Sequence, residues 1–583
     1  MTELHTTATN HVLDGVPASS GIAIGPARII RLDHTDELDL RLLEPEDVQL
    51  ELERLRAALA DADRELQHVE ALTREEVADR AGIFEALRMM LHDTQLVAAI
   101  EERITGGRIS AHAAIVAEMT RLAAVFLESK DDTMRSRAED VRALQTHLVA
   151  CLSNSPLPSG VHHDAVLVMH QLSPRDAVVY SRGRAAAFVV EVGGINSHAA
   201  ILARSFGVPM VAGVRDVTRL AEAEQSIVVD GYTGRVIVRP DAEMIAQYEA
   251  RKSSLEVQRE RYRAVRDLPA ETADGERVVL AANLDMIDEM EAAIENGADE
   301  IGLMRTEYLV MGRDGDISME EQLHYYRQIA ERAYPMTVTF RAFDIGSDKL
   351  VGEVWGRSDS PLGLRGIRLL LVRQEVLRRQ LEALLRASST KNLRLMLPMV
   401  TSVDEVRHVK RIVEEIRAKL RSEKVAFDEY MPIGTMIEVP AAALTAETLA
   451  GESAFLSLGT NDLAQYTLAV DREDESLDAY YDELHPGVLR LIRHTIVAAR
   501  RSGVPATICG ELAANPLATG LLIGLGIRRF SVPPLQLGPL KMRVRSITTH
   551  EAFAWARAAL RMPTAGEVRT FLASCNGGGE GDY

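Results

Sequence analysis

From Val278 onward the chain alternates short apolar segments with longer amphipathic ones, and this alternation restricts the possible folds more than any other feature. Amphipathic stretches such as SVDEVRHVKRIVEEIRAKL separate the apolar segments. Repeated strand–helix units form parallel sheets, and eight units in about 300 residues predict a (β/α)8 TIM barrel. The eight candidate strands are VVLAANLD, EIGLMRTEYL, VTFRAFDIG, LRLMLPMV, PIGTMIEVP, FLSLGTND, PATICGELA and RRFSVPP.

Polar residues follow the apolar cores of these strands, at the end where TIM barrels place their active sites. Glu438 and Asp462 offer two hard oxygen ligands, which suit Mg²⁺ when substrate and water complete its shell. Guanidinium forks suit phosphate oxygens, although the alternative for each arginine is an ordinary surface ion pair. The strand ends therefore predict a site for a substrate with phosphate and carboxylate groups. Its polar candidates are Arg305, Arg341, Asp344, Lys349, Arg365, Glu438, Asn461, Asp462, Arg472 and Cys509.

The N-terminal part divides into helical and strand-forming stretches. Between about Leu42 and Cys151, roughly four stretches repeat apolar residues at helical spacing and predict an antiparallel bundle. VPASSGIAIGPARII before them predicts a strand, and AVLVMHQL, AAAFVVEVGG and SIVVDGYTGRVIV after them predict a compact α/β unit. The charged stretch DAEMIAQYEARKSSLEVQRERYRAVRDL then predicts a connecting helix.

Composition excludes several classes of protein. Lys and Arg number 66 against 86 Asp and Glu, and the resulting net charge of −20 opposes nonspecific binding to nucleic acid or anionic membrane. The opening MTELHTTATNHVLDG has no apolar core, so we expect neither a signal peptide nor a membrane span, and we expect a cytoplasmic protein. Cys151, Cys509 and Cys575 are scattered, which argues against a disulfide framework or a zinc site.

The stretch GGINSHAAILARSFGVPMVAG, residues 193–213, centres on His198. Glycines, Asn196 and Ser197 followed by an apolar run predict a loop, a helix N-cap and a short helix that ends near Gly207. A helix N-terminus favours an anion, so a histidine placed there can carry a phosphoryl group. The alternative is a surface or core histidine that only caps the helix.

This stretch resembles the phosphohistidine loop of the phosphoenolpyruvate-utilising enzymes, a family that includes Enzyme I of the bacterial sugar phosphotransferase system, phosphoenolpyruvate synthase and pyruvate phosphate dikinase. The match covers GG, SH, IxAR and a following Gly and Pro, and it implies that His198 accepts the phosphoryl group. The strand-end motifs resemble the phosphoenolpyruvate site of the same family. The resemblance implies that Arg305 and Arg341 grip phosphate with Lys349, Arg365, Asn461 and Arg472, that Glu438 and Asp462 bind Mg²⁺, and that Cys509 donates a proton.

The region before the histidine unit distinguishes members of this family. The synthase and the dikinase need a nucleotide-binding domain, whereas about 150 mostly helical residues without a Gly-rich phosphate loop stand here. This resemblance to Enzyme I implies that phosphoenolpyruvate phosphorylates His198, which passes the group to a histidine of a small phosphocarrier protein. The alternatives are a regulatory scaffold that binds phosphoenolpyruvate and a Mg²⁺-dependent barrel lyase acting on an oxo acid. The family also implies a homodimer formed through the barrel.

The resemblance and the patterning together predict a multidomain protein. We expect an α/β phosphohistidine swivelling domain that carries an inserted helical bundle, then a linker helix and a C-terminal TIM barrel. The expected boundaries are 1–15 for a flexible tail, 16–35 and 152–240 for the swivelling domain, 36–151 for the helical carrier-binding subdomain, 241–270 for the linker helix, 271–575 for the barrel and 576–583 for a second flexible tail.

Two departures from the Enzyme I pattern bear on partner choice. Ala199 follows the histidine where Enzyme I has Thr or Ser, although Ser173 in QLSPRD matches the hydroxyl residue that the family holds near its histidine. On the presumed docking helix, FEALRMMLHD has Leu87 in place of a His and His92 in place of a Glu. We therefore expect a dedicated carrier protein.

Overall fold

The computed structural model describes residues 10–30, 42–76, 82–127, 132–152, 164–195, 197–310, 317–345, 362–472 and 474–576. Lys349, Asn196 and most of both predicted tails lie outside these residues. The chain forms two compact units, Met1–Val257 and Gln258–Tyr583, and each is described by itself. Within the described residues, no helix is long and apolar enough to cross a membrane.

The first unit contains an eight-stranded sheet with the strand order β1-β8-β7-β3-β4-β5-β6-β2. Strands β3 to β6 run parallel in the centre, and antiparallel pairs flank them on both sides. The first four residues of β4 and of β5 are apolar and buried, as expected of strands that are covered on both faces of a parallel sheet. The strands are β1 (His11–Asp14), β2 (Val16–Ser19), β3 (Ile22–Ile30), β4 (Val166–Gln171), β5 (Ala187–Val192), β6 (Met210–Ala212), β7 (Ser226–Asp230) and β8 (Arg235–Val238).

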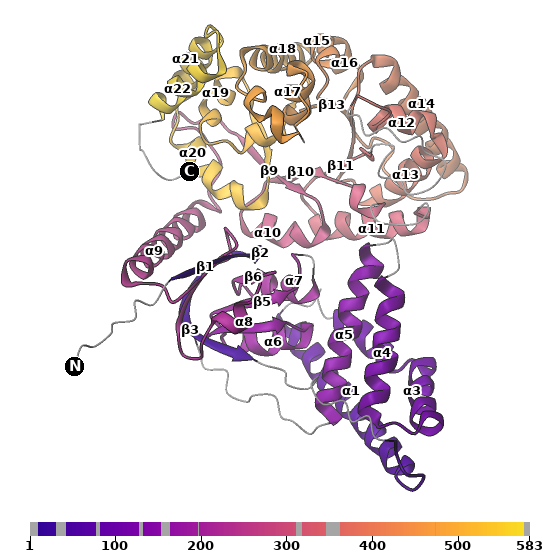
Figure 1. Ribbon diagram of the computed structural model, residues 1–583. Helices are drawn as coiled ribbons and strands as arrows, with labels where there is room; N and C mark the ends of the chain where they lie inside the picture. Colours follow the sequence, from indigo (N-terminus) through magenta and orange to yellow (C-terminus); the bar gives the residue numbers. More distant parts are fainter. Residues whose placement is uncertain are drawn as a thin grey trace, which may run out of the picture. The chain divides into compact units, whose positions relative to one another are not determined.

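Short helices α6 (Pro174–Arg182), α7 (His198–Ser205) and α8 (Val217–Leu220) accompany this sheet (Figure 1). The prediction of a flexible tail over residues 1–15 is wrong for its described part. His11–Asp14 form β1, because all four residues pair antiparallel with β8 and so cover the edge of that strand.

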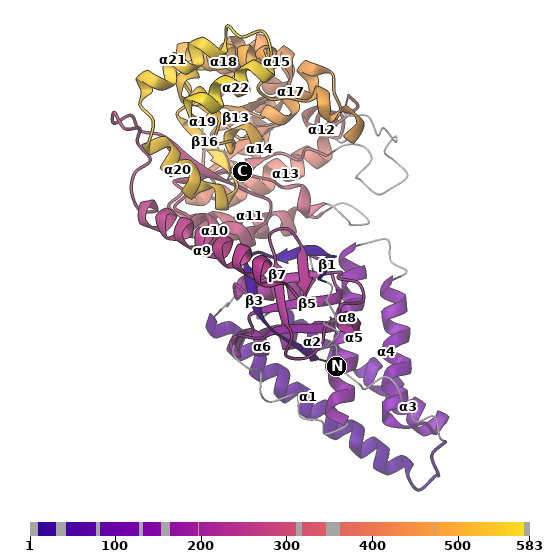
Figure 2. The ribbon, with the colours of Figure 1, turned by 60° about the vertical axis from the view of Figure 1, so that its left-hand side comes forward.

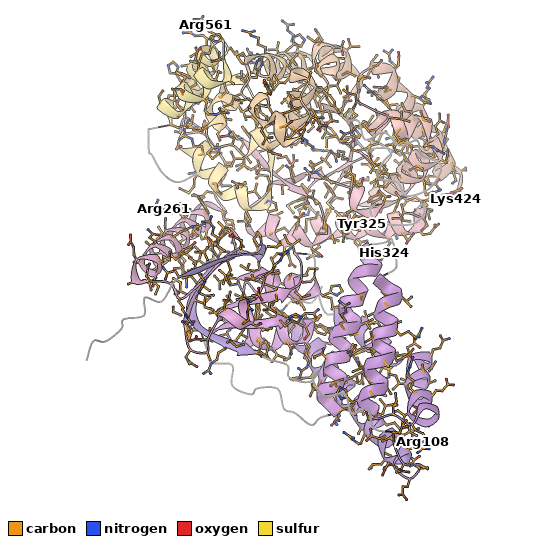
Figure 3. The ribbon with its side chains drawn as sticks, viewed as in Figure 1. Arg108, Arg261, His324, Tyr325, Lys424 and Arg561 are labelled. Atoms are coloured by element: carbon orange, nitrogen blue, oxygen red, sulfur yellow. The ribbon has the colours of Figure 1, made fainter. Side chains whose placement is uncertain are left out.

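A helical bundle is inserted between the neighbouring strands β3 and β4 (Figures 1 and 2). In the described residues of this region, five helices stand where four helical stretches are predicted. Asp93 ends one helix and caps the next by accepting hydrogen bonds from the backbone N–H groups of Gln95 and Leu96. Arg108, labelled in Figure 3, donates to the carbonyl of Leu43 and fastens the segment before the first helix. The helices are α1 (Val48–Glu76), α2 (Gly82–Leu91), α3 (Thr94–Gly107), α4 (Ala111–Leu127) and α5 (Asp132–Leu152).

The second unit is built on a closed barrel of parallel strands in the order β9 to β16, with β16 paired to β9. All eight predicted strands form, so the TIM barrel prediction is confirmed. The predicted connecting helix is α9 (Ala242–Val265), which spans the division between the two units. The strands are β9 (Val279–Leu284), β10 (Glu300–Met304), β11 (Val338–Arg341), β12 (Leu393–Leu397), β13 (Ile433–Ile437), β14 (Leu456–Leu458), β15 (Ala506–Ile508) and β16 (Arg529–Val532).

Amphipathic helices surround this barrel and bury its outer face (Figure 2). On α11, which carries the labelled His324 and Tyr325 in Figure 3, the next residue Tyr326 packs edge-on against Phe340 of β11 with ring centroids 5.0 Å apart. The helices are α10 (Met290–Glu295), α11 (Met319–Ala333), α12 (Gly366–Val372), α13 (Gln374–Ala387), α14 (Val403–Ser422), α15 (Pro440–Leu444), α16 (Ala446–Glu452), α17 (Thr460–Leu468), α18 (Pro486–Ser502), α19 (Ala518–Leu525), α20 (Leu537–Arg545), α21 (Thr549–Ala559) and α22 (Ala565–Cys575).

Candidate functional site

His198 is the first residue of α7, as the sequence predicts. Ser197 caps the helix, and its hydroxyl accepts a hydrogen bond of 3.2 Å from the backbone N–H of Ala200. Arg204 on the last turn donates to the carbonyl of Ile195 and so holds the loop in front of the cap. The imidazole therefore stands at the N-terminus of a capped helix.

The partner of the imidazole is Asp140 on α5, a residue that the sequence did not reveal. Nδ1 of His198 lies 2.7 Å from Oδ1 of Asp140, and the Asp140 side chain is only 4% exposed. The predicted hydroxyl neighbour, Ser173, makes its described hydrogen bonds with Asp176 as the N-cap of α6. A carboxylate at Nδ1 selects the tautomer that carries a proton there, which leaves Nε2 as the nucleophilic nitrogen.

The two unusual residues of the presumed docking helix differ in exposure. Leu87 on α2 is 4% exposed and packs in the core of the bundle, so it cannot contact a partner protein. His92 is exposed, and its Nε2 lies 3.0 Å from Oδ1 of Asp63 on α1. The interpretation of Leu87 as a change in the docking surface is therefore wrong, because its helical position faces inward.

Glu438 follows β13 and is 1% exposed. Its Oε1 accepts a hydrogen bond of 2.5 Å from the backbone N–H of Met399, which fixes the carboxylate at the end of the strand. Burial, followed by the negative charges of Asp462 and Asp344, raises the pKa of Glu438 to about 8. A buried carboxyl whose neighbours are also carboxylates is stabilised in its ionised form by a bound cation.

Asp462 supplies the second candidate ligand from α17, after β14. Its buried Oδ1 accepts no hydrogen bond from the described residues, and Nη1 of Arg365 lies 3.6 Å away. A buried carboxylate oxygen without a donor is unusual and fits a position that a cation fills. With Glu438 it provides the pair of hard oxygen ligands that Mg²⁺ takes together with substrate and water.

Arg341 and Arg365 converge on Asp344 at the same barrel end. Nη1 of Arg341 lies 3.3 Å from Oδ2 of Asp344, and Arg365 reaches both oxygens of Asp344 with its Nε and Nη2. A second carboxylate, Glu307, accepts a hydrogen bond of 3.0 Å from Nη2 of Arg341. Two guanidinium groups are thus held rigidly among carboxylates, which orients their forks for an anionic substrate.

The remaining predicted barrel residues lie around this cluster. Asn461 joins two strand-end loops, because its amide donates to Oε1 of Glu511 and accepts from the backbone N–H of Glu511. Arg305 is exposed and its Nη1 donates to Asp285 at 2.7 Å. Burial raises the pKa of Asp344, but Arg341, Arg365 and, less strongly, Arg472 bring it below its usual value. Lys349 lies outside the described residues.

Cys509 follows β15 and is 6% exposed. Its Sγ lies 3.2 Å from the Ser457 hydroxyl, which donates to it, and 3.4 Å from the carbonyl oxygen of Leu458. Burial raises the pKa of the Cys509 thiol to about 11. The negative charge of Glu438 also raises this pKa, whereas the positive charges of Arg341 and Arg305 lower it. The thiol is therefore protonated at neutral pH and lies close to the charged cluster.

Sequence reasoning missed the carboxylates that orient the predicted groups. Glu307 and Asp285 pair with arginines of the barrel, and Asp140 pairs with the histidine. Glu307 stands in GLMRTEY, two residues after Arg305. Its position at the end of a predicted strand could therefore have identified it as a site residue. No such signal exists for Asp140, which lies on a bundle helix 58 residues before its partner.

Three parts of the chain match families of PEP-utilising enzymes. Residues 14–137 match the family described as "PEP-utilising enzyme, N-terminal", and residues 161–234 match "PEP-utilising enzyme, mobile domain". Residues 259–549 match "PEP-utilising enzyme, PEP-binding domain". The second match contains His198, and the third contains every predicted barrel residue.

Individual proteins are similar to the N-terminal part of the chain or to nearly all of it. The solved structure "NMR solution structure of Enzyme I (nEIt) protein using two 4D-spectra" is 30% identical, with a TM-score of 0.36, and covers 42% of this chain and 99% of that one. The "Phosphoenolpyruvate-protein phosphotransferase" of Bacillus subtilis (strain 168) is 34% identical over 96% of this chain and 99% of that protein. The protein of the same name from Geobacillus stearothermophilus is 36% identical over 96% of this chain and 97% of its own length. The chain therefore belongs to the PEP-utilising enzymes, and within them to the phosphoenolpyruvate-protein phosphotransferases.

Proposed function

We propose that this chain transfers the phosphoryl group of phosphoenolpyruvate to Nε2 of His198 and then to a histidine of a small phosphocarrier protein, with release of pyruvate. The observation that carries the proposal is the imidazole at the start of α7, whose Nδ1 lies on Asp140, so that in this arrangement Nε2 is the nitrogen that would pass the phosphoryl group to the carrier. The helix N-terminus favours the added anion. Membership of the phosphotransferases supports the same activity.

The strand-end cluster would bind the substrate. Glu438 and Asp462 would hold Mg²⁺, which supplies a positive charge that draws electrons from the phosphate as the phosphoryl group leaves. Arg341 and Arg305, assisted by Lys349, Arg365, Asn461 and Arg472, would neutralise charge on the phosphate and carboxylate oxygens. The carboxylates and Arg341 are largely buried, which strengthens their electrostatic interactions with a bound substrate.

Cys509 would complete the reaction by donating a proton. Loss of the phosphoryl group leaves the enolate of pyruvate, and its methylene carbon takes up the thiol proton to give the methyl group of the ketone. The raised pKa of the thiol keeps that proton in place at neutral pH. Conversion of enolate to ketone draws the transfer forward.

Replacement of Cys509 by serine should block proton transfer and leave the fold intact. Serine is smaller but can still accept the hydrogen bond from Ser457. We expect exchange of the pyruvate methyl protons in D2O, measured by NMR in the presence of Mg²⁺, to fall about 10²- to 10⁴-fold. His198→Ala is the matched control and retains exchange, because the histidine takes no part in enolisation. Undiminished exchange in the serine variant would remove Cys509 from the mechanism.

The two half-reactions need His198 in two positions. In the structure its imidazole is bonded to the helical bundle through Asp140. Transfer from phosphoenolpyruvate requires this bond to open, so we propose that the α/β domain, with the boundaries predicted from the sequence and with β1 added, swivels between the barrel and the bundle. The bundle would then dock the carrier protein, and the barrel would form the homodimer in the cytoplasm.

Asp140→Asn should separate the two half-reactions. The amide is isosteric but has no charge with which to hold the Nδ1 proton, so we expect phosphoryl transfer to the carrier to slow by about 10- to 100-fold, as when other histidine-orienting partners are lost. Labelling of His198 by phosphoenolpyruvate should change little. Rapid-quench measurement of each half-reaction tests this, and ¹⁵N NMR of the imidazole reports the tautomer. Equal slowing of both steps would contradict the assigned role.

Labelled phosphoenolpyruvate tests the function as a whole. The purified chain is incubated with it and Mg²⁺, pyruvate is measured, and acid-labile phosphate is located by peptide mapping. We expect one label on His198 for each pyruvate formed. Pyruvate without label would indicate a barrel lyase or hydrolase, and binding without pyruvate would indicate a regulatory scaffold.

A further inference from the structure

Glu65, which is exposed, and the partly buried His147 and Cys151 bring three different ligand types together at the surface of the helical bundle. Glu65 lies on α1, and His147 and Cys151 are four residues apart on α5, so they occupy one face of that helix. One ligand atom from each residue lies within 4.8 Å of the other two. This cluster takes no part in the proposed phosphoryl transfer.

The geometry of the cluster is close to that of a transition-metal site. Nε2 of His147 lies 3.0 Å from Oε2 of Glu65. Any two nitrogen or oxygen ligands of a tetrahedral Zn²⁺ lie about 3.3 Å apart, because the metal–ligand bonds are about 2.0 to 2.1 Å long. The nitrogen and oxygen therefore need to part by only a few tenths of an ångström, and the Cys151 sulfur lies within 4.8 Å of a ligand atom of each of the other two residues.

Neighbouring side chains hold two of the proposed ligands in place. The His147 side chain is 9% exposed, so its ring is held by packing. Arg175 on α6 donates to Oε2 of Glu65 at 2.6 Å and through Nη1 to Oδ1 of Asp176 at 3.2 Å. The guanidinium thus orients the Glu65 carboxylate, and because it contacts the same oxygen as His147, a cation bound there displaces it toward Asp176, with which it is already paired.

We propose that Glu65, His147 and Cys151 form a binding site for a divalent transition-metal cation of the Zn²⁺ class, with water as the fourth ligand. Thiolate and imidazole ligands select such cations over Mg²⁺, so the site is distinct in chemistry from Glu438 and Asp462. Binding replaces the thiol proton of Cys151 by the cation and releases one proton to solvent. The scattered cysteines hid this site in the sequence, because its third ligand comes from another helix.

The position of the site links it to the reactive histidine. Asp140, which bonds His198, and His147 lie seven residues apart on α5, about 10 Å along the helix. Arg175 lies two residues after Ser173, the N-cap of α6. A bound cation therefore stiffens the contact of α1, α5 and α6 beside the phosphohistidine.

Cobalt(II) binding tests the proposal on the full chain. Under anaerobic conditions without reductant thiols, and with excess Mg²⁺ to occupy the barrel site, we expect one Co²⁺ per chain and an intense sulfur-to-cobalt charge-transfer band in the near ultraviolet. Cys151→Ser should abolish the band, and His147→Gln should weaken Co²⁺ affinity by more than about 100-fold, since loss of outer-shell partners alone costs about 10- to 100-fold. Zn²⁺ should displace Co²⁺ and bleach the band.

The double variant Cys509→Ser with Cys575→Ser is the matched control, because it keeps Cys151 as the only cysteine. It should retain the band and the 1:1 stoichiometry. Circular dichroism of each variant without metal should match that of the parent chain, which separates loss of the site from loss of the fold. A band that survives Cys151→Ser, or the absence of saturable binding in both the parent chain and the double variant, would overturn the proposal.

Discussion

Replacing His198 with alanine abolishes labelling of the chain by phosphoenolpyruvate. The imidazole is the acceptor in the proposed reaction, so its loss removes the covalent intermediate rather than slowing its formation. The helix should persist, because its capping hydrogen bond is donated by the backbone N–H of Ala200 to the Ser197 hydroxyl and does not involve the imidazole. We expect binding of phosphoenolpyruvate, measured by calorimetry with Mg²⁺, to stay within about twofold of the parent value, since uniform binding energy is not lost when only the nucleophile is removed.

A second histidine of the same unit provides the matched control. His170 on β4 is exposed and its Nδ1 lies 2.8 Å from a carboxylate oxygen of Glu191, so it shares the histidine–carboxylate pairing without the helix terminus. His170→Ala should label as fast as the parent chain. Acid-labile phosphate that persists in the His198 variant would mean that another residue is the acceptor.

The barrel could be predicted in detail because its signals are local. Each strand is a short apolar segment between amphipathic helices, and the strand-end rule then places polar residues at one end without knowledge of their partners. Glu438, Asp462, Arg341 and Arg365 are all brought together in this way. Asp93 shows the limit of the method, since a single capping residue divides one apolar helical pattern into two helices.

The partners of the reactive groups could not be predicted, because they arise from contacts between segments distant in sequence. Asp140 meets His198 only when the bundle packs against the α/β sheet, and Leu87 proves buried only when α2 is placed in that bundle. Helical periodicity gives the apolar face of each helix but not which helix covers it. The family resemblance supplied roles for single residues, whereas their pairing required the folded chain.

Glu438→Gln should remove Mg²⁺ binding and reduce phosphoryl transfer by at least about 10³-fold, because a ligand is lost and the metal contributes several kcal/mol of transition-state stabilisation. The glutamine carbonyl can still accept the hydrogen bond from Met399, so the strand end keeps its shape. Glu452→Gln is the matched control. That carboxylate lies on α16, pairs with Arg407 and Lys410 at the surface, and should leave Mg²⁺ affinity unchanged.

The same carboxyl makes Mg²⁺ affinity depend on pH. Its pKa is raised to about 8, so protonation competes with the metal below that pH. The apparent Mg²⁺ affinity should therefore fall as pH decreases from 8 to 6, approaching tenfold per pH unit.

The stability of the metal-free chain should depend on pH in the opposite direction. The folded-state pKa is above the unfolded value, so wild-type stability declines as pH rises from about 5 to 8. Glutamine does not ionise, so the variant should lose this decline, and its metal-free unfolding temperature at pH 8 should equal or exceed that of wild type. Mg²⁺ should then raise the unfolding temperature of the wild type alone. A variant that Mg²⁺ still stabilises would contradict the assignment of Glu438 as a ligand, because the one change between the two chains is the charge that the cation requires.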